Sequence, residues 1–157
     1  MKPRVYVETS VISYLASHPS RDLIVAANQQ ITQDWWRLRR SDFDLFISQL
    51  VDQEARAGDT DAAQRRLALY AEIPLLELGE DALALAQALI REGPMPQRAV
   101  EDALHIAVAT VHGMDYLLTW NFKHIANATM RYRIERVCRK HAFEPPIICT
   151  PQELLEE

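Results

Sequence analysis

Five short apolar segments alternate with longer amphipathic segments along this chain, and this alternation constrains the fold more than any other feature. Each short segment is apolar nearly throughout, which is typical of strands covered on both faces of a parallel sheet. Such an alternation predicts right-handed crossovers and helices on both sides of the sheet. We therefore predict an α/β fold, a three-layer α/β/α sandwich around a central, mainly parallel five-stranded sheet, with residues 1–157 forming one domain. The expected strands are residues 4–8, 44–48, 73–78, 116–119 and 146–149, and the expected helices are residues 21–39, 50–57, 61–71, 80–91, 98–112 and 130–141.

The composition fits a globular protein of the cytoplasm. Hydrophobic residues make up 48% of the chain and charged residues 25%, as in ordinary soluble domains. The apolar runs are too short to span a membrane, and Met1 to Arg4 lead directly into a strand, so we expect no signal peptide and no membrane partner. The two cysteines are too few for a disulfide framework or a CxxC metal site.

The net charge of −5 argues against a protein that coats nucleic acid by bulk electrostatics. Basic residues nevertheless gather in the last third of the chain. A solvated helix face is the favoured interpretation of these residues, and a basic rim beside an acidic site is the alternative. The basic residues in question are Lys123, Arg131, Arg133, Arg136, Arg139 and Lys140.

Polar and acidic side chains follow three of the expected strands. Glu8 ends the first strand, Glu54 lies in the helix after the second, and Asn121 follows Thr119 at the end of the fourth. Ligands of open α/β sheets gather beyond the carboxyl ends of the strands. We therefore expect these side chains to meet at one edge of the sheet.

The helix over residues 98–112 adds Asp102 and His105, which lie three residues apart and share a face. An acid in the first turn of a helix is also favoured by the helix dipole alone, so a purely structural role for Asp102 remains open. His105 fits a packing or supporting role better than that of a ligand.

Several carboxylates in one pocket repel one another. Two of them about 4 Å apart cost roughly 4 kcal/mol at an effective dielectric near 20, so protons or a cation must offset the repulsion. Oxygen ligands indicate a hard ion, Mg²⁺ or Mn²⁺. Such an ion can activate a water to attack a phosphodiester.

Four motifs in order, "YVETSVISYL", "ISQLVDQEA", "AVEDALHIAVA" and "YLLTWNFKHIAN", resemble the PIN-domain ribonucleases, in particular the VapC-like toxins of toxin–antitoxin pairs. The resemblance covers nearly the whole chain. It implies a catalytic site of Glu8, Glu54, Asp102 and Asn121, with Mg²⁺ or Mn²⁺ held by Glu8, Glu54 and Asp102. It also implies an RNA substrate, an antitoxin partner and a homodimer. The supporting residues that it implies are Thr9, Ser10, Thr119 and His105.

Two positions depart from the family pattern. The family more often has Asp at the position of Glu8, and it usually has an acid at the position of Asn121. The loss of one charge predicts weaker metal binding, and it leaves open an alternative function as a catalytically weakened or inactive PIN-like module that binds RNA or protein. Lys123, Arg131 and Arg133 are the residues that we expect to contact RNA phosphates. Receiver domains and haloacid-dehalogenase-like phosphatases need paired acids after the first strand, and the chain lacks this pair.

Overall fold

The computed structural model describes residues 1–156, which form a five-stranded sheet in the order β3-β2-β1-β4-β5. All four strand pairings are parallel, as the alternation of strands and helices predicts. The first strand of the chain therefore lies in the middle of the sheet. The strands are β1 (Arg4–Val7), β2 (Asp44–Ser48), β3 (Leu75–Leu76), β4 (Tyr116–Leu118) and β5 (Ile147–Cys149).

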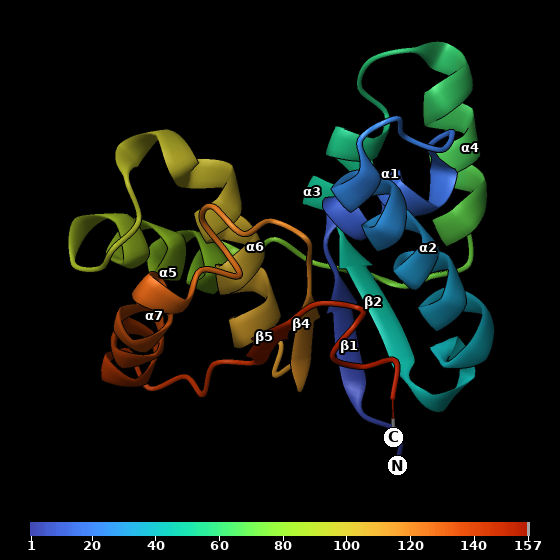
Figure 1. The fold of residues 1–157 in the computed structure, drawn as a ribbon. Helices are drawn as coiled ribbons and strands as arrows, with labels where there is room; N and C mark the ends of the chain where they lie inside the picture. Colours follow the sequence, from blue (N-terminus) through green and yellow to red (C-terminus); the bar gives the residue numbers. More distant parts are fainter. Residues whose placement is uncertain (157) are drawn as a thin grey trace.

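Helices cover both faces of the sheet (Figure 1). The first four helices of the chain lie on one side, and the last three lie on the other side. This arrangement confirms the predicted three-layer α/β/α architecture. The first group consists of α1 (Thr9–Ala16), α2 (Leu23–Leu38), α3 (Gln49–Ala55) and α4 (Thr60–Tyr70), and the second of α5 (Glu80–Arg91), α6 (Val100–Val111) and α7 (Ala128–Lys140). Two 3-10 turns complete the list, at Arg40–Asp42 and Gln97–Ala99.

Helix α1 is absent from the predicted elements. Its segment starts with two hydroxyl residues and contains β-branched side chains, which favour helices only weakly, so it resembles an extension of the preceding strand. Thr9 and Ser10 belong to the first turn of this helix. Glu8 is the N-cap, because its side chain accepts a hydrogen bond from the Ser10 amide.

Strand β3 is shorter than the predicted segment of residues 73–78. The Ile73 amide donates to the Tyr70 carbonyl as part of a turn, and Pro74 has no amide to offer to a neighbouring strand. Leu75 is half exposed at the edge of the sheet. Only two residues therefore pair with β2.

The strand register aligns the ends of β1 and β4. The Glu8 amide donates to the Leu118 carbonyl over 3.0 Å, and the Thr119 amide donates to the Cys149 carbonyl over the same distance. Since β1 lies between β2 and β4, the residues that follow these three strands come out next to one another. This edge of the sheet carries the candidate site.

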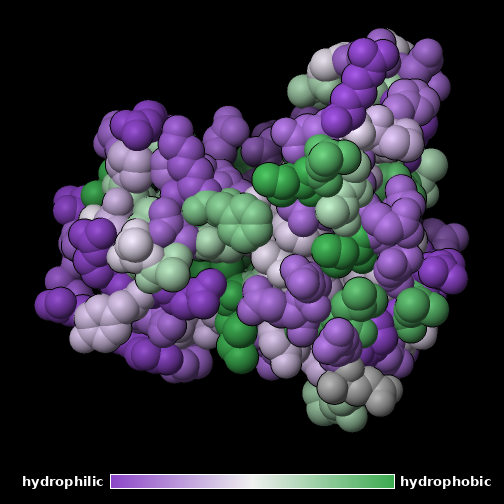
Figure 2. Space-filling view, viewed as in Figure 1, coloured by the Kyte–Doolittle hydropathy of each residue, from purple (hydrophilic) through white to green (hydrophobic). Residues whose placement is uncertain are grey.

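The surface in Figure 2 is mainly hydrophilic, with hydrophobic atoms in separate patches. The most exposed large apolar side chains inside an element are Leu23 and Ile24, at the start of α2. In the part of the chain that the structure describes, every helix is too short or too polar to cross a bilayer. Cys138 and Cys149 are buried, and burial raises the pKa of these thiols to about 11 and about 12, respectively.

Candidate active site

Glu8 lies at the centre of the site and is almost completely enclosed, with 6% of its surface exposed. Its Oε1 accepts hydrogen bonds from the hydroxyls of Ser10 and Thr119, each over 2.5 Å. Its Oε2 accepts a longer bond of 3.2 Å from the Ser10 amide. Thr119 is fully buried. The carboxylate is thus held by the start of α1 on one side and by the end of β4 on the other.

Glu54 approaches Glu8 from α3. Its Oε1 accepts hydrogen bonds from the Thr9 hydroxyl and from His105 Nε2, the latter over 2.7 Å. Thr9 belongs to α1 and His105 to α6, so three helices meet at this carboxylate. About a quarter of the Glu54 side chain remains exposed, which leaves access from solvent.

A buried chain of hydrogen bonds fixes His105 from behind. Its Nδ1 lies 2.7 Å from the Tyr6 hydroxyl, and the same hydroxyl lies 2.7 Å from Ser48 Oγ. Ser48 Oγ also accepts from the Leu50 amide over 3.2 Å and so caps α3. When Nε2–H donates to Glu54, a neutral His105 can accept from Tyr6, and Tyr6 can accept from Ser48. This chain connects the cap of α3 to the acid that α3 carries.

The pKa values of His105 and Glu54 shift in opposite directions. Burial favours the neutral form of His105, but the hydrogen bond that it donates to Glu54 and the charges of Glu8, Glu54 and Asp102 outweigh it and raise its pKa. Burial likewise disfavours the Glu54 carboxylate, yet the hydrogen bond and the charge of His105 outweigh it and lower the pKa of Glu54. The pair is therefore stabilised in its ionic form.

Glu101 is a further acid at the site that the sequence reasoning missed. Its hydrogen bond with Glu54 and the negative charge of Glu54 raise its pKa above the usual value. The negative charge of Glu54 thus disfavours a second carboxylate beside it. Glu101 stands next to Asp102 in the motif "AVEDALHIAVA", so proximity in the sequence was the available signal.

Asp102 lies in a second cluster, near the start of α6. Its Oδ1 accepts from Asn121 Nδ2 and its Oδ2 accepts from His124 Nδ1, each over 2.9 Å. The Asn121 Oδ1 in turn accepts from the His124 amide over 3.1 Å. The sequence reasoning missed His124 as well as Tyr6, and neither carries a signal in the sequence apart from its position near the end of a strand.

The structure connects the two clusters through Thr119. The backbone amide of Asn121 donates to Thr119 Oγ1 over 2.9 Å, and the Thr119 hydroxyl donates to Glu8. Within residues 1–156, the set of acids, histidines and cysteines whose ligand atoms all lie within 4.8 Å of one another is Glu8, Glu54 and His105. Asp102 is not in this set, and hydrogen bonds through Asn121 and Thr119 connect it to Glu8.

The expected basic residues do not form one surface. Lys123 is exposed in the loop after β4. Arg131 lines a cavity with Pro146 and Ile148, and its Nε is buried without a hydrogen-bond partner among the described residues. Arg133 is exposed and lines a different cavity. Two residues apart on a helix, Arg131 and Arg133 point to different sides.

The donor set at the site fits a hard cation. Carboxylate oxygens are the ligands that Mg²⁺ and Mn²⁺ prefer, and Oε2 of Glu8 has only one long hydrogen bond. Both ring nitrogens of His105 are already engaged, by Glu54 and by Tyr6, so this histidine serves as a support for Glu54. A cation bound there would compensate the negative charge of Glu8 and Glu54.

The comparisons with known proteins agree with this geometry. Residues 5–127 match the family model of the PIN domain. A chain in the crystal structure of VapBC2 from Rickettsia felis bound to a DNA fragment from their promoter is similar in fold, with a TM-score of 0.58 and 12% sequence identity. The likeness covers 94% of this chain and 98% of that chain. No curated protein sequence matches significantly. Since the family match spans most of its length and includes Glu8, Glu54, Asp102 and Asn121, the chain belongs to the PIN domain family.

Proposed function

We propose that this protein is a metal-dependent ribonuclease that hydrolyses RNA phosphodiester bonds with Mg²⁺ or Mn²⁺. The observation that carries the proposal is the position of Glu8 and Glu54, whose ligand atoms lie within 4.8 Å at the carboxyl edge of a PIN-domain sheet. Paired carboxylates at such close range serve poorly as a structural element, because they repel each other. They serve well as ligands of a cation.

Glu8 and Glu54 would hold the ion, and Asp102 would complete its surroundings from the side. When bound, the ion supplies an activated water and stabilises charge on the phosphoryl oxygens. The residues of the chain keep the ligands in place: Ser10 and Thr119 hold Glu8, while Thr9 and His105 hold Glu54. Supports of this kind orient the ligands of a metal and tune its affinity.

We further propose that the protein acts as the toxin of a toxin–antitoxin pair in the cytoplasm. The fold likeness to a chain of the VapBC2 structure supports this role, as does the resemblance of the four motifs to VapC-like toxins. The partners would be an antitoxin protein and a second copy of the chain.

A second function, an inactive module that binds RNA or protein, is favoured by one observation. Both oxygens of Asp102 accept hydrogen bonds, one from the Asn121 amide and one from His124. In a four-acid site, residue 121 would repel Asp102 and attract a cation. Here the uncharged side-chain amide of Asn121 donates to Asp102 instead, so this pair of residues does not require a cation.

Cleavage of labelled single-stranded RNA with and without EDTA separates these functions. We expect cleavage in Mg²⁺ or Mn²⁺, no cleavage in EDTA, and recovery when the metal is added back. A Glu54→Gln protein purified in parallel shows whether a contaminating nuclease is present. Cleavage that survives chelation excludes the metal from the reaction, and salt-dependent RNA binding without cleavage in any metal supports the binding module.

A further inference from the structure

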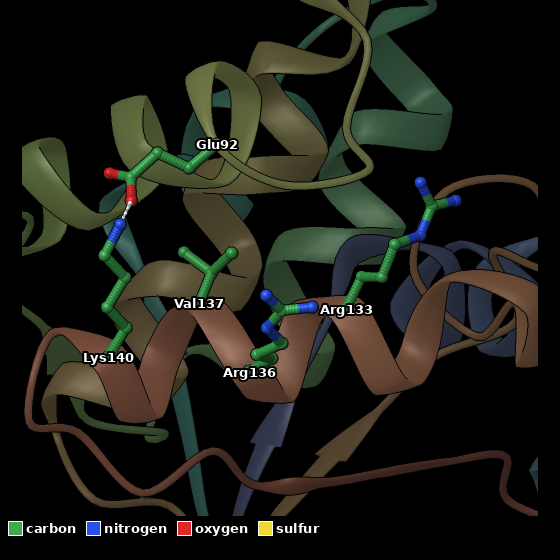
Figure 3. Close-up of a pocket in the computed structure, with 5 residues that line it drawn as sticks. All are labelled: Glu92, Arg133, Arg136, Val137 and Lys140. Atoms are coloured by element: carbon green, nitrogen blue, oxygen red, sulfur yellow. Dashed lines mark hydrogen bonds and ion pairs between the residues drawn. The ribbon is translucent and has the colours of Figure 1, made fainter.

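A basic cavity of about 150 Å³ lies between α7 and the end of α5 (Figure 3). Figure 3 shows Arg133, Arg136 and Lys140 projecting from α7 on the side of Val137, with Glu92 opposite. These five residues line the cavity.

The spacing along α7 places the three basic side chains in a row. Positions 133, 136 and 140 are separated by three and four residues, so they share a face of the helix. The row is about 10 Å long at 1.5 Å per residue. The turn after α5 closes tightly against it at Gly93, where a side chain would meet the Leu89 carbonyl at 2.8 Å and Val137 at 3.1 Å.

The cavity carries an excess of positive charge. Glu92 is its one acid, and this acid is shared between Lys140 at 2.5 Å and His141 at 3.0 Å. Within residues 1–156, the cationic side chains of α7 that form ion pairs are Arg139 and Lys140. Arg133 and Arg136 are not in these pairs, so their guanidinium groups can bind another anion, on a chain whose net charge is −5.

The helix that carries the row follows the acidic edge, the edge of the sheet with Glu8 and Glu54, along the chain. The loop between β4 and α7 contains Asn121 and His124, which contact Asp102, and α7 starts directly after this loop. Tyr132, next to Arg133, is 72% exposed. Exposed aromatic rings between basic side chains are typical of surfaces that bind single-stranded nucleic acid, because bases stack on the rings while cations hold the phosphates.

We propose that Arg133, Arg136 and Lys140 form a second RNA-binding surface, which holds phosphates of a single-stranded RNA outside the acidic site. This proposal rests on RNA being the ligand, as in the proposed function. An acidic protein segment is the competing occupant. The exposed Tyr132 beside the row and the position of α7 after the acidic edge along the chain favour RNA.

The test is the affinity for a fluorescently labelled single-stranded RNA, measured by anisotropy in EDTA over a salt series. The double variant Arg133→Gln/Arg136→Gln removes two phosphate contacts, so the slope of log K against log salt should flatten by about 1.4. If the lost contacts contribute nothing at 1 M salt, this corresponds to roughly 25-fold weaker binding at 0.1 M salt. An unchanged slope would overturn the proposal.

Two control proteins distinguish a defined binding surface from a general effect of net charge. Arg133→Lys/Arg136→Lys keeps both charges at the same places and should retain most of the slope. Lys2→Gln/Arg37→Gln removes two exposed charges from the other end of the sheet and from α2, and it should bind RNA like the parent chain. An equal loss in this second control would mean that net charge alone governs binding, which contradicts a defined surface.

The proposal and the proposed function can fail separately. RNA binding in EDTA needs no cleavage, so a flattened slope supports the surface even if no metal produces activity. Conversely, a cleaving enzyme whose slope does not respond to the double variant loses only the surface. Polyglutamate that displaces the labelled RNA as effectively as unlabelled RNA would assign the row to an acidic protein and overturn the RNA proposal.

Discussion

The centre around Glu8 and the cluster around Asp102 are built in different ways, although both carry acids of the same site. Glu8 and Thr119 are almost fully buried and directly follow two paired strands. Asp102, Asn121 and His124 are partly exposed and belong to the first turn of a helix and to a loop. One region is held by the sheet, whereas the other is held mainly by hydrogen bonds among its own side chains.

Because of this difference, substitutions in the two regions should affect catalytic activity and the free energy of unfolding to different extents. A buried carboxylate that loses a hydroxyl donor keeps its charge without compensation, which is costly. A partly exposed carboxylate can turn to water instead. We therefore expect changes around Asp102 to affect activity far more than folding, and changes around Glu8 to affect both.

Asp102→Asn should give the largest effect on the reaction. It removes a negative charge beside the proposed cation, and removal of one electrostatic contact to a transition state typically costs about 10²- to 10³-fold in rate. The Asn121 amide can still donate to the new side chain, so the free energy of unfolding should change by less than about 1 kcal/mol. Initial cleavage rates and urea unfolding of the metal-free protein measure the two quantities. A protein that no longer folds would show that Asp102 is structural and would remove the contrast between the regions.

Thr119→Val should give the largest effect on stability. The variant keeps the shape of the side chain but takes a donor from the buried Glu8 carboxylate, which costs about 1.5–3 kcal/mol for a bond to a charged group. Thr129→Val is the matched control, because the Thr129 hydroxyl donates to Asn127 in an exposed place and its loss should cost less than about 0.5 kcal/mol. Equal unfolding energies for the two variants would show that the centre is no more dependent on its hydroxyls than the surface is.

Asn121→Asp should give a smaller effect, with opposite signs in the two states of the site. The new carboxylate faces Asp102, where the amide donates over 2.9 Å, so the metal-free protein should lose at least about 1 kcal/mol. With Mn²⁺ present, the same charge should tighten metal binding. Thermal melts with and without Mn²⁺, together with a metal titration, measure this crossover.

Asn127→Asp provides the control for that variant. Asn127 caps α7 through its Oδ1, and Asp caps helices equally well, so neither metal affinity nor stability should change appreciably. If Asn121→Asp behaves like this control, residue 121 does not belong to the metal site, and its position in the family motif has no chemical consequence here.

The architecture could be predicted because it depends on periodic patterns. The five apolar segments and the amphipathic segments between them are long-range features that any α/β sheet must show. Helix α1 was missed because its sequence is apolar and β-branched, and what stabilises it is its position against the sheet and the Glu8 cap. Tertiary context outweighs local propensity in such cases.

The site could be predicted only in part, for a related reason. The sheet-edge rule and the family motifs indicate which elements carry the acids, but they say nothing about side-chain partners. The sequence placed Asp102 and His105 on one face, yet His105 turns to Glu54 and Asp102 turns to Asn121 and His124. Which of several nearby groups shares a hydrogen bond depends on distances of a few tenths of an ångström, and spacing along a helix does not contain them.

The central position of β1 also determines when the site comes into existence during synthesis. Glu8 leaves the ribosome before its donor Thr119, which follows 111 residues later. At a synthesis rate of about 5–20 residues per second, this delay amounts to roughly 6–22 s. Throughout that interval the N-terminal strand lacks its neighbour β4, and the acids cannot be brought together. A nascent chain of this topology therefore carries no assembled centre until β4 and Thr119 have been synthesised.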